Sequence, residues 1–333
     1  MKIGLLHDSV LPPKTYGGIE RIVMILAKEY TRLGHKVVLL CREAGEKARD
    51  YEVVTLPSGF DRTDLSHFLP KDLDFLHSHQ PLHLRPKIPF LVTIHGNGHA
   101  EEKYHANTNF LSKSHAANHT AKYFVYNGVD PTHFPFEKNK QDYFVFLART
   151  TWRVKNVKTA IAWANDLGVD LKIMGGNGIS RGRIQYQGLT DEQTKLGLLK
   201  NAAALIYPTN WDEPCAAAPL EALACGTPVI TSPNGCMPEL VQGGTGVVCS
   251  NYVELLEAAV KVRSIDPGKC RNSIETFFSL ERMAGDYLNL IQRILEKGDL
   301  DHQPRYAFRK ESVKLLYKPT LRNRLQIAVT GKI

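Results

Sequence analysis

Short apolar runs alternate with polar connections rich in glycine and proline along most of this chain. The opening run at 2–9 predicts a buried strand, and a helical spacing of apolar residues then extends from Ile19 to Gly34, where glycine favours a helix end. We expect further strands in the first half at 35–41, 51–57, 73–79, 89–95 and 122–129. Buried strands joined by such connections are typical of a parallel sheet covered on both faces.

A polar, proline-bearing stretch at 131–142 separates this alternation from a second one, so we expect a domain boundary there. The second half predicts strands at 143–149, 170–175, 184–188, 204–208 and 228–232, and helices near 155–167, 191–202 and 217–225. The clearest amphipathic helix covers 279–298. The sequence therefore predicts an α/β protein with domains at 1–135 and 136–298, followed by a tail at 299–333.

Length and composition agree with two ordinary globular domains. The chain has 333 residues, of which 43% are hydrophobic and 23% are charged. The first ten residues do not resemble a signal peptide, because Asp8 interrupts the apolar run. No run approaches the roughly 18 to 20 apolar residues that a membrane-spanning helix needs. We therefore expect a cytoplasmic protein, either free or held peripherally at the inner face of the membrane.

The cysteines are widely spaced, without a C-x-x-C pair or a zinc-ligand pattern. They are Cys41, Cys215, Cys225, Cys236, Cys249 and Cys270. We expect free thiols in a reducing compartment.

Most of the net charge of +8 lies at the C-terminal end. Residues 301–333 hold eight Lys or Arg against Asp301 and Glu311, a local charge of +6. Without the spacing of a recognition motif, this charge does not predict nucleic-acid binding. Basic and apolar residues interleaved in this way suit contact with an anionic bilayer. The alternative, which we favour, is that the tail packs its apolar residues on the first domain.

Candidate chemistry is sought beyond the carboxyl ends of the strands, where parallel sheets bind ligands. Gly17 and Gly18 open the first expected helix, where glycine lets the backbone approach a ligand and unpaired N–H groups attract an anion. A plain strand-to-helix turn explains this pair equally well. Gly175 begins a second glycine-rich segment after a strand, which suits either approach to a nucleotide or an ordinary turn.

Two permanent cations stand at the start of the second sheet. Arg149 ends its first expected strand, and Lys155 follows where a helix begins. The pair suits a diphosphate, which Arg binds through its fork and Lys as a point charge. Taken alone, solvated surface charge is the simpler explanation.

The strongest signal lies at 212–230, where a strand ends in a loop that carries Glu213 and the next helix carries Glu221. Carboxylates accept hydrogen bonds from paired hydroxyls, so one suits the sugar and the other the ribose of a sugar nucleotide. Small residues between them would let backbone N–H groups reach a phosphate. These small residues are Cys215, Ala216, Ala217 and Ala218.

Together these features resemble the retaining group 1 glycosyltransferases (glycosyltransferase family 4) of the GT-B fold, over roughly 1–297. The matching parts, in chain order, are the Gly17-Gly18 loop, Thr93-Ile94-His95-Gly96, Asn127-Gly128-Val129-Asp130, Arg149 with Lys155, and the segment from Glu213 to Glu221. The resemblance implies two Rossmann-like, doubly wound parallel-sheet domains that face a cleft. The acceptor would lie on the side of the first domain and the nucleotide sugar on the second.

The resemblance also implies transfer of a sugar from a nucleoside diphosphate sugar, UDP rather than GDP, to a saccharide or glycolipid acceptor, with retention of anomeric configuration. In that family the positions of Arg149 and Lys155 neutralise the leaving diphosphate, and that of Glu221 holds the ribose. The position of Glu213 contacts the donor sugar, and that of His95 lies beside the reacting carbon. Since preplaced cations stabilise charge that grows on the phosphate, we expect no metal and no other cofactor.

The chain departs from the family pattern in three ways. The usual Glu-Pro-Phe-Gly-Leu motif reads Glu213-Pro214-Cys215-Ala216-Ala217, so that Ala216 replaces its glycine. Asn156 follows the lysine and Ala148 precedes the arginine where the family has glycine, and the first domain is short, so we expect it to lack elements that hold an acceptor elsewhere in the family.

Other functions stay open on the sequence alone. A sugar-nucleotide epimerase or a phosphorylase on the same two-domain fold would bind similar donors and release different products. A non-catalytic sugar-nucleotide-binding or membrane-attached protein would result if the alanine replacements spoil the site. Histidines crowd the first domain, but without an acidic partner at ligand spacing they do not predict a metal site. They are His77, His79, His83, His99, His105, His115 and His119.

Overall fold

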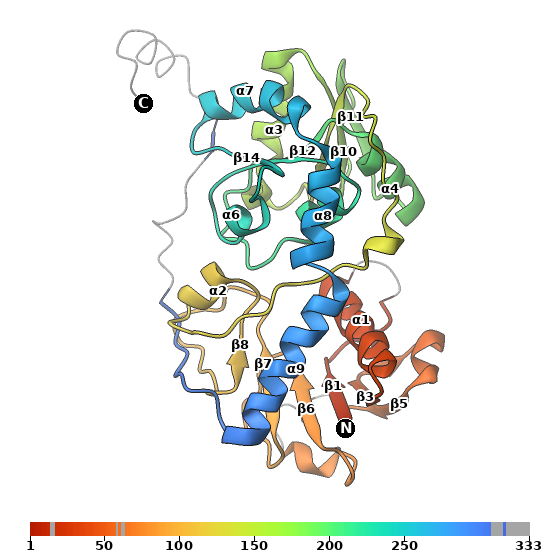
Figure 1. Cartoon of the computed structure of the whole chain (residues 1–333), viewed down its shortest axis with the longest axis vertical. Coiled ribbons are helices and arrows are strands. Elements are labelled where there is room, and N and C mark those ends of the chain that lie inside the picture. Colours follow the sequence, from red (N-terminus) through yellow and green to blue (C-terminus); the bar gives the residue numbers. More distant parts are fainter. Residues whose placement is uncertain (14–16, 58, 61–63, 308–315, 318–333) are drawn as a thin grey trace. The chain divides into compact units, whose positions relative to one another are not determined.

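A computed structural model of the chain describes residues 1–13, 17–57, 59–60, 64–307 and 316–317 (Figure 1). The chain divides into two compact units. Unit 1 contains Met1–Val129 and Phe277–Arg309, and unit 2 contains Asp130–Thr276 and Lys310–Ile333. Each unit is a parallel sheet with helices packed on it, as the sequence predicts.

The sheet of unit 1 has the strand order β5-β3-β1-β6-β7-β8, and all of its strand pairs are parallel. Its strands are β1 (Lys2–Leu6), β3 (Lys36–Cys41), β5 (Glu52–Thr55), β6 (Phe75–Ser78), β7 (Phe90–Thr93) and β8 (Thr108–Asn109). A separate short pair joins β2 (Val10–Leu11) to β4 (Glu43–Ala44).

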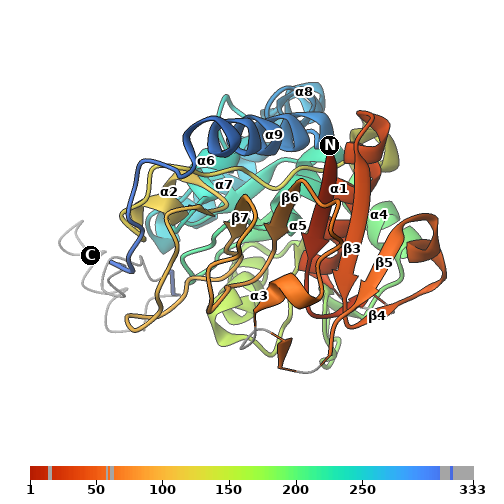
Figure 2. The same cartoon turned by 90° about the horizontal axis from the view of Figure 1, so that it is seen from below.

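Alternation along the strands of unit 1 sends side chains to two buried faces. Ile3 and Leu5 of β1 enter a core with α1 (Gly18–Arg32) and α9 (Leu280–Lys297), whereas Leu6 enters the core on the opposite face. Figure 2 shows α9 running along one side of these strands. Both faces are therefore covered, which explains the continuously apolar strands.

Helix α9 corrects the expected domain boundaries, which assigned 279–298 to the second domain. Its buried stripe, including Met283, Tyr287 and Ile291, completes the core of unit 1. The chain crosses to unit 2 after Val129 rather than after residue 135, and it returns at Phe277. Periodicity shows that a helix has a buried face, but it does not show which sheet covers that face.

The strand expected at 122–129 is also corrected. This segment makes two isolated bridges, from Phe124 to Phe110 and from Val129 to Ser279, and does not form a strand. Gly128 passes so close to Ser279 that a Cβ would lie 2.5 Å from its carbonyl oxygen. The last strand of the sheet is instead β8, whose two polar residues give no apolar run.

The described part of the tail is not an independent segment. Leu300 is buried in the core of unit 1, and the ring of Tyr306 lies 5.6 Å from that of His119, so this part packs on the first domain as expected. Leu316, however, is buried in the core of unit 2. The remaining tail residues of the membrane hypothesis lie outside the described residues. They are Phe308, Arg309, Lys310, Val313, Lys314, Leu315, Lys318, Leu321, Arg322, Arg324, Leu325 and Ile327.

The sheet of unit 2 has the strand order β11-β10-β9-β12-β13-β14, again with parallel pairs throughout. Its strands are β9 (Tyr143–Leu147), β10 (Asp170–Met174), β11 (Ile184–Gly188), β12 (Ala204–Tyr207), β13 (Val229–Thr231) and β14 (Gly246–Val248). The first five were expected and β14 was not. Because β10 lies on one side of β9 and β12 on the other, the strand order changes direction between β9 and β12.

Helices cover this second sheet as well. The α-helices are α3 (Val157–Leu167), α4 (Glu192–Asn201), α5 (Ala217–Ala224), α6 (Met237–Leu240), α7 (Tyr252–Lys261) and α8 (Pro267–Phe277), with α2 (Lys113–Ala117) in unit 1. Trp163 of α3 is fully buried, stacks edge-on against Phe144, and donates its indole N–H to the carbonyl of Leu255 in α7. This contact ties two helices to one face of the sheet.

Two sequence expectations concern absences. All six cysteines are buried and free, as predicted. Among the described residues, none of the helices combines the length and apolar character needed to cross a membrane.

Candidate active site

Polar loops follow the carboxyl ends of three neighbouring strands of unit 2. The loop after β9 carries Arg149 and Lys155, the loop after β12 carries Glu213, and the loop after β13 carries Asn234. Parallel neighbours bring these loops to one edge of the sheet, at the point where the strand order changes direction. The candidate site therefore lies where this class of sheet binds ligands.

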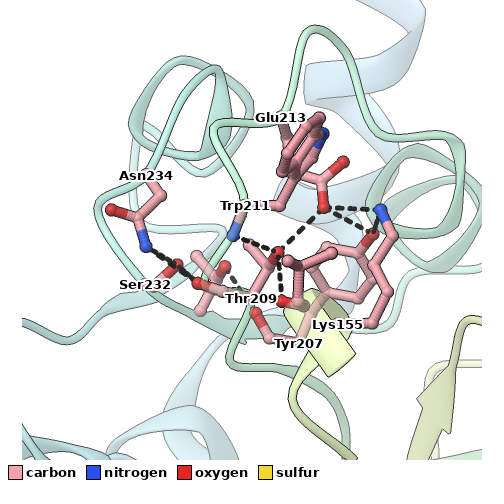
Figure 3. Close-up of polar contacts among 9 residues, drawn as sticks. Lys155, Tyr207, Thr209, Trp211, Glu213, Ser232 and Asn234 are labelled. Carbon is pink, nitrogen blue, oxygen red and sulfur yellow. Dashed lines mark hydrogen bonds and ion pairs between the residues drawn. The ribbon is translucent and has the colours of Figure 1, made fainter. Parts of the chain in front are cut away.

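Lys155 and Glu213 form an ion pair at the centre of this edge (Figure 3). Lys155 Nζ lies 2.6 Å from Glu213 Oε1 and 3.0 Å from the Tyr207 hydroxyl. The exposed fractions of the two side chains are 12% and 5%, so the pair is largely removed from water. Because an ammonium has three N–H donors, these two contacts leave a third for a ligand.

Two hydroxyls complete the surroundings of the carboxylate. Tyr207 and Thr209 lie 3.1 and 2.9 Å from Glu213 Oε1. Thr209 is itself fixed from the next strand, since the Ser232 hydroxyl and the Asn234 amide donate to its carbonyl oxygen at 2.6 and 2.8 Å. A buried charge with this many partners keeps one orientation.

Gly235 explains how the loop after β13 comes so close. Its φ is +59°, and a Cβ would lie 2.2 Å from the backbone nitrogen of Glu213. Only glycine fits there. Sequence reasoning missed Tyr207, Thr209 and Gly235; the Asn234-Gly235 pair was the available signal, because Asn-Gly marks a tight turn.

Arg149 lies in the same turn as Lys155, and the two cations share one aromatic neighbour. The guanidinium carbon of Arg149 is 5.4 Å from the ring centre of Trp152, and Lys155 Nζ is 5.9 Å from it. Arg149 is exposed and Trp152 is half exposed. The structure thus places a solvent-facing cation beside the buried one, as the diphosphate hypothesis requires, and adds an indole that the sequence did not suggest.

Glu221 occupies α5, away from the Lys155–Glu213 pair in its contacts. Its carboxylate lies 2.9 Å from Nζ of Lys195 in α4, and the same ammonium lies 3.0 Å from Glu192. Lys195 is 9% exposed. Any ribose hydroxyl that approaches Glu221 would therefore meet a carboxylate already fixed by a lysine.

The residue that replaces the family's glycine, just before α5, keeps an ordinary backbone. Ala216 is the N-cap residue with φ −77° and ψ 125°, angles that any residue adopts. Replacing the usual glycine by Ala216 therefore brings no backbone strain. Cys215 and Ala216 are buried, whereas Ala217 is exposed and Ala218 half-buried.

Glycine at 175 has a structural reason. Its φ is +100°, and a Cβ would lie 2.3 Å from the carbonyl oxygen of Ala148. Close packing between the ends of β9 and β10 therefore accounts for Gly175, and its expected contact with the donor stays a prediction. Asn156, the second departure from the family pattern, has φ +60°, which is the left-handed region.

In unit 1, Gly17 and Gly18 lie at the start of α1. Gly17 is its N-cap, and a Cβ there would lie 2.6 Å from the side chain of Pro13. Around Gly18 no described atom lies within 4 Å of such a Cβ, so the backbone is open there. Packing explains Gly17, and an open helix start at Gly18 is compatible with an approaching anion.

His95 follows β7, and two other histidines follow the neighbouring strands. His7 comes after β1 and His79 after β6, so the ends of three adjacent strands each carry an imidazole at the point where this sheet changes direction. His79 Nδ1 and His95 Nε2 are 3.0 Å apart. Burial lowers the pKa of His95 to about 3 and that of His79 well below its usual value, so both rings are neutral at pH 7.

Two further histidines of unit 1, His115 and His119, contact protein groups. His115 lies 2.9 Å from the carbonyl oxygen of Gly96, and His119 stacks on Phe110 with ring centres 4.3 Å apart. Within the described ranges, three or more His, Cys, Asp or Glu side chains are nowhere grouped so that they could hold a metal ion.

Family models match both units. A model described as "Glycosyl transferases group 1" matches residues 130–276, and one described as "Glycosyltransferase Family 4" matches residues 16–143. Together they run from residue 16 to residue 276. The chain belongs to the group 1 glycosyltransferases, with the GT-B fold.

Curated relatives match only part of the chain. A probable sucrose-phosphate synthase of Thermosipho melanesiensis is 34% identical over 109 residues, which is 30% of this chain and 26% of that protein. A GDP-mannose-dependent alpha-(1-6)-phosphatidylinositol dimannoside mannosyltransferase of Mycobacterium tuberculosis is 27% identical over 144 residues, 39% of this chain and 38% of that protein. The matched parts thus span well under half of these two relatives.

Solved structures share the fold over nearly the whole chain. AviGT4, a glycosyltransferase involved in avilamycin A biosynthesis, has a TM-score of 0.71 at 22% identity and covers 89% of this chain and 98% of its own. HepE of Anabaena in complex with UDP-glucose has a TM-score of 0.63 at 13% identity, with 89% and 98% covered.

Proposed function

We propose that this chain is a retaining glycosyltransferase that moves a sugar from a nucleoside diphosphate sugar to a saccharide or glycolipid acceptor. The observation that carries the proposal is the buried Lys155–Glu213 pair with Arg149 beside it, at the ligand-binding edge of the unit matched by the group 1 model. A lysine with one donor left over and an exposed guanidinium provide positive charge for a leaving diphosphate.

In this mechanism the leaving diphosphate departs toward Arg149 and Lys155. Charge on the departing phosphate grows as the bond to the sugar breaks, so cations already in place stabilise the transition state more than the ground state. Glu213 holds Lys155 and accepts hydrogen bonds from hydroxyls of the donor sugar, and neutral His95 donates a hydrogen bond near the anomeric carbon. Glu221 binds the ribose.

For the donor we propose UDP. HepE of Anabaena, which is similar in structure, binds UDP-glucose, whereas the mycobacterial mannosyltransferase, which is similar in sequence, is GDP-mannose-dependent. A titration calorimetry comparison of UDP with GDP tests this choice, and tighter binding of GDP would reverse it.

The activity test incubates the full chain with UDP-sugars and GDP-sugars, with and without a panel of saccharide and glycolipid acceptors. We expect release of the nucleoside diphosphate that depends on acceptor, and a product whose anomeric configuration by NMR equals that of the donor. An epimerised donor would indicate an epimerase, and binding without turnover a non-catalytic protein. We expect turnover to persist in excess EDTA, because the protein supplies the cations; loss of turnover that Mg²⁺ or Mn²⁺ restores would contradict metal independence.

A further inference from the structure

A residue of the C-terminal segment is built into the back of the candidate site. Leu316 is fully buried in the core of unit 2. Side chains satisfy both of its backbone polar groups. Its N–H donates to Asn210 Oδ1 at 2.8 Å, and its carbonyl oxygen accepts from Asn156 Nδ2 at 2.5 Å and from the Thr159 hydroxyl at 3.0 Å.

The partners of Leu316 adjoin the two site residues. Asn156 directly follows Lys155, and Asn210 lies in the loop that leads to Glu213. These two loops also touch each other, since the N–H of Asn210 donates to the carbonyl oxygen of Val154 at 2.7 Å.

Leu316 thereby closes a ring of contacts. From Leu316 the ring runs through Asn210 to Thr209, whose hydroxyl contacts Glu213, and back through Lys155 and Asn156. In such a ring each contact limits the movement of the next one.

Asn156 shows why this chain differs from the family pattern here. Its φ of +60° and ψ of 40° suit glycine, and asparagine is among the few other residues that adopt them. Unlike glycine, it brings an amide, which donates to the carbonyl oxygens of both Pro208 and Leu316. The replacement keeps the backbone turn and adds a docking point for the C-terminal segment.

We propose that Leu316 is a positioning residue: its docking holds the loops of Lys155 and Glu213 at the spacing that sugar transfer requires. The inference rests on the proposed function for its catalytic consequence. The docking itself does not depend on that function and can be measured separately.

The test compares Leu316→Ala and Asn156→Gly in the full chain with Tyr317→Ala, whose side chain is 57% exposed. Leu316→Ala removes the apolar anchor, and Asn156→Gly removes the amide while keeping the turn. We expect kcat to fall about tenfold in the first two variants with little change in donor KM, because small misplacement of catalytic groups affects the transition state most. Hydrogen exchange at 153–156 and 209–213 should rise about tenfold. Tyr317→Ala should match the unaltered chain in both measurements.

The exchange measurement separates this proposal from the proposed function. If the unaltered chain transfers no sugar, the proposed function fails, and exchange alone decides whether Leu316 holds the loops. If Leu316→Ala does not fold, Asn156→Gly decides, since it leaves the apolar anchor in place. Unchanged exchange in Asn156→Gly, or unchanged kcat in an active chain, would overturn the proposal.

Discussion

At the scale of single residues, the site depends on charges that are buried before any ligand arrives. Removing one partner of a buried ion pair leaves the other uncompensated, which typically costs about 3 to 5 kcal/mol of stability. In Lys155→Ala, however, Glu213 keeps the hydroxyls of Tyr207 and Thr209. Stability and catalysis therefore need separate measurements in every variant of this pair.

We expect Lys155→Ala to lower kcat about 100-fold with a smaller effect on donor KM, because charge on the leaving group grows only toward the transition state. Glu221→Ala should instead raise the donor KM about tenfold, because ribose contacts hold the ground and transition states alike. Steady-state kinetics with the donor varied measure both. Exposed Lys158, three residues beyond Lys155, provides the control. If Lys158→Ala loses as much activity as Lys155→Ala, the effect is general electrostatics and the assignment is wrong.

A second residue-scale prediction concerns the tautomer of His95. Nε2 of His79 is buried without a hydrogen-bond partner among the described residues. An unpaired N–H costs more there than an unpaired lone pair, so the proton of His79 belongs on Nδ1, from which it donates to His95 Nε2. His95 then carries its proton on Nδ1.

Substitutions of His79 test this assignment. The amide nitrogen of His79→Asn takes the place of Nδ1, so this variant should retain kcat, whereas His79→Leu should lower it about tenfold. ¹⁵N NMR of labelled histidine should show His95 protonated on Nδ1 in the unaltered chain and in His79→Asn. A proton on Nε2 of His95 in the unaltered chain would refute the assignment, whatever the activity.

At the scale of elements, most strands and helices followed from the sequence because their faces are buried. Ile3 and Leu5 face one core and Leu6 faces the other, and the two-residue period of a strand is enough to predict this alternation. The expectations that were wrong depended on contacts between residues far apart in sequence. The position of α9 in unit 1 and the passage of Gly128 beside Ser279 join segments separated by about 150 residues or more in sequence, and no local pattern encodes them.

The residues of the candidate site divide in the same way, into those that the local sequence indicates and those that it does not. Lys155 and Glu213 were predicted because each lies in a loop that follows a strand, and the carboxyl ends of parallel strands meet at one edge of the sheet. Tyr207 and Thr209 were missed because a strand-end Tyr and Thr read as ordinary strand residues. Leu316 was missed because its partners lie more than 100 residues away.

Two glycines near α9 provide an element-scale prediction. Gly128→Ala should destabilise unit 1 by about 1 to 3 kcal/mol, because its Cβ would lie 2.5 Å from the backbone oxygen of Ser279. Gly285→Ala, inside α9, should stabilise unit 1 by about 0.5 to 1 kcal/mol, because described atoms leave that position open and alanine favours the helix. Scanning calorimetry measures both. If Gly128→Ala leaves the stability of unit 1 unchanged, α9 does not pack tightly against this turn.

At the scale of the whole molecule, the two units share one sheet plan but differ in their buried titratable groups. Of the 13 histidines, only His133 belongs to unit 2, and it is exposed. All three tryptophans belong to unit 2; they are Trp152, Trp163 and Trp211. Acid should therefore act on unit 1 first, while tryptophan fluorescence reports on unit 2.

The last prediction is this difference in acid sensitivity. Burial lowers the pKa values of His77, His95 and His115 to about 3, against about 6.5 in the unfolded chain. Well above pH 6.5 these residues are neutral in both the folded and the unfolded chain, so they do not reduce the unfolding free energy. As pH falls below 6.5, the unfolded chain binds protons that the folded chain excludes, so each histidine lowers the unfolding free energy by up to about 1.4 kcal/mol per pH unit. Between pH 6.5 and 4.5, native-state hydrogen exchange should show unit 1 weakening while the urea midpoint by tryptophan fluorescence moves little. Parallel weakening of both units would mean that carboxylates, and not these histidines, govern the loss.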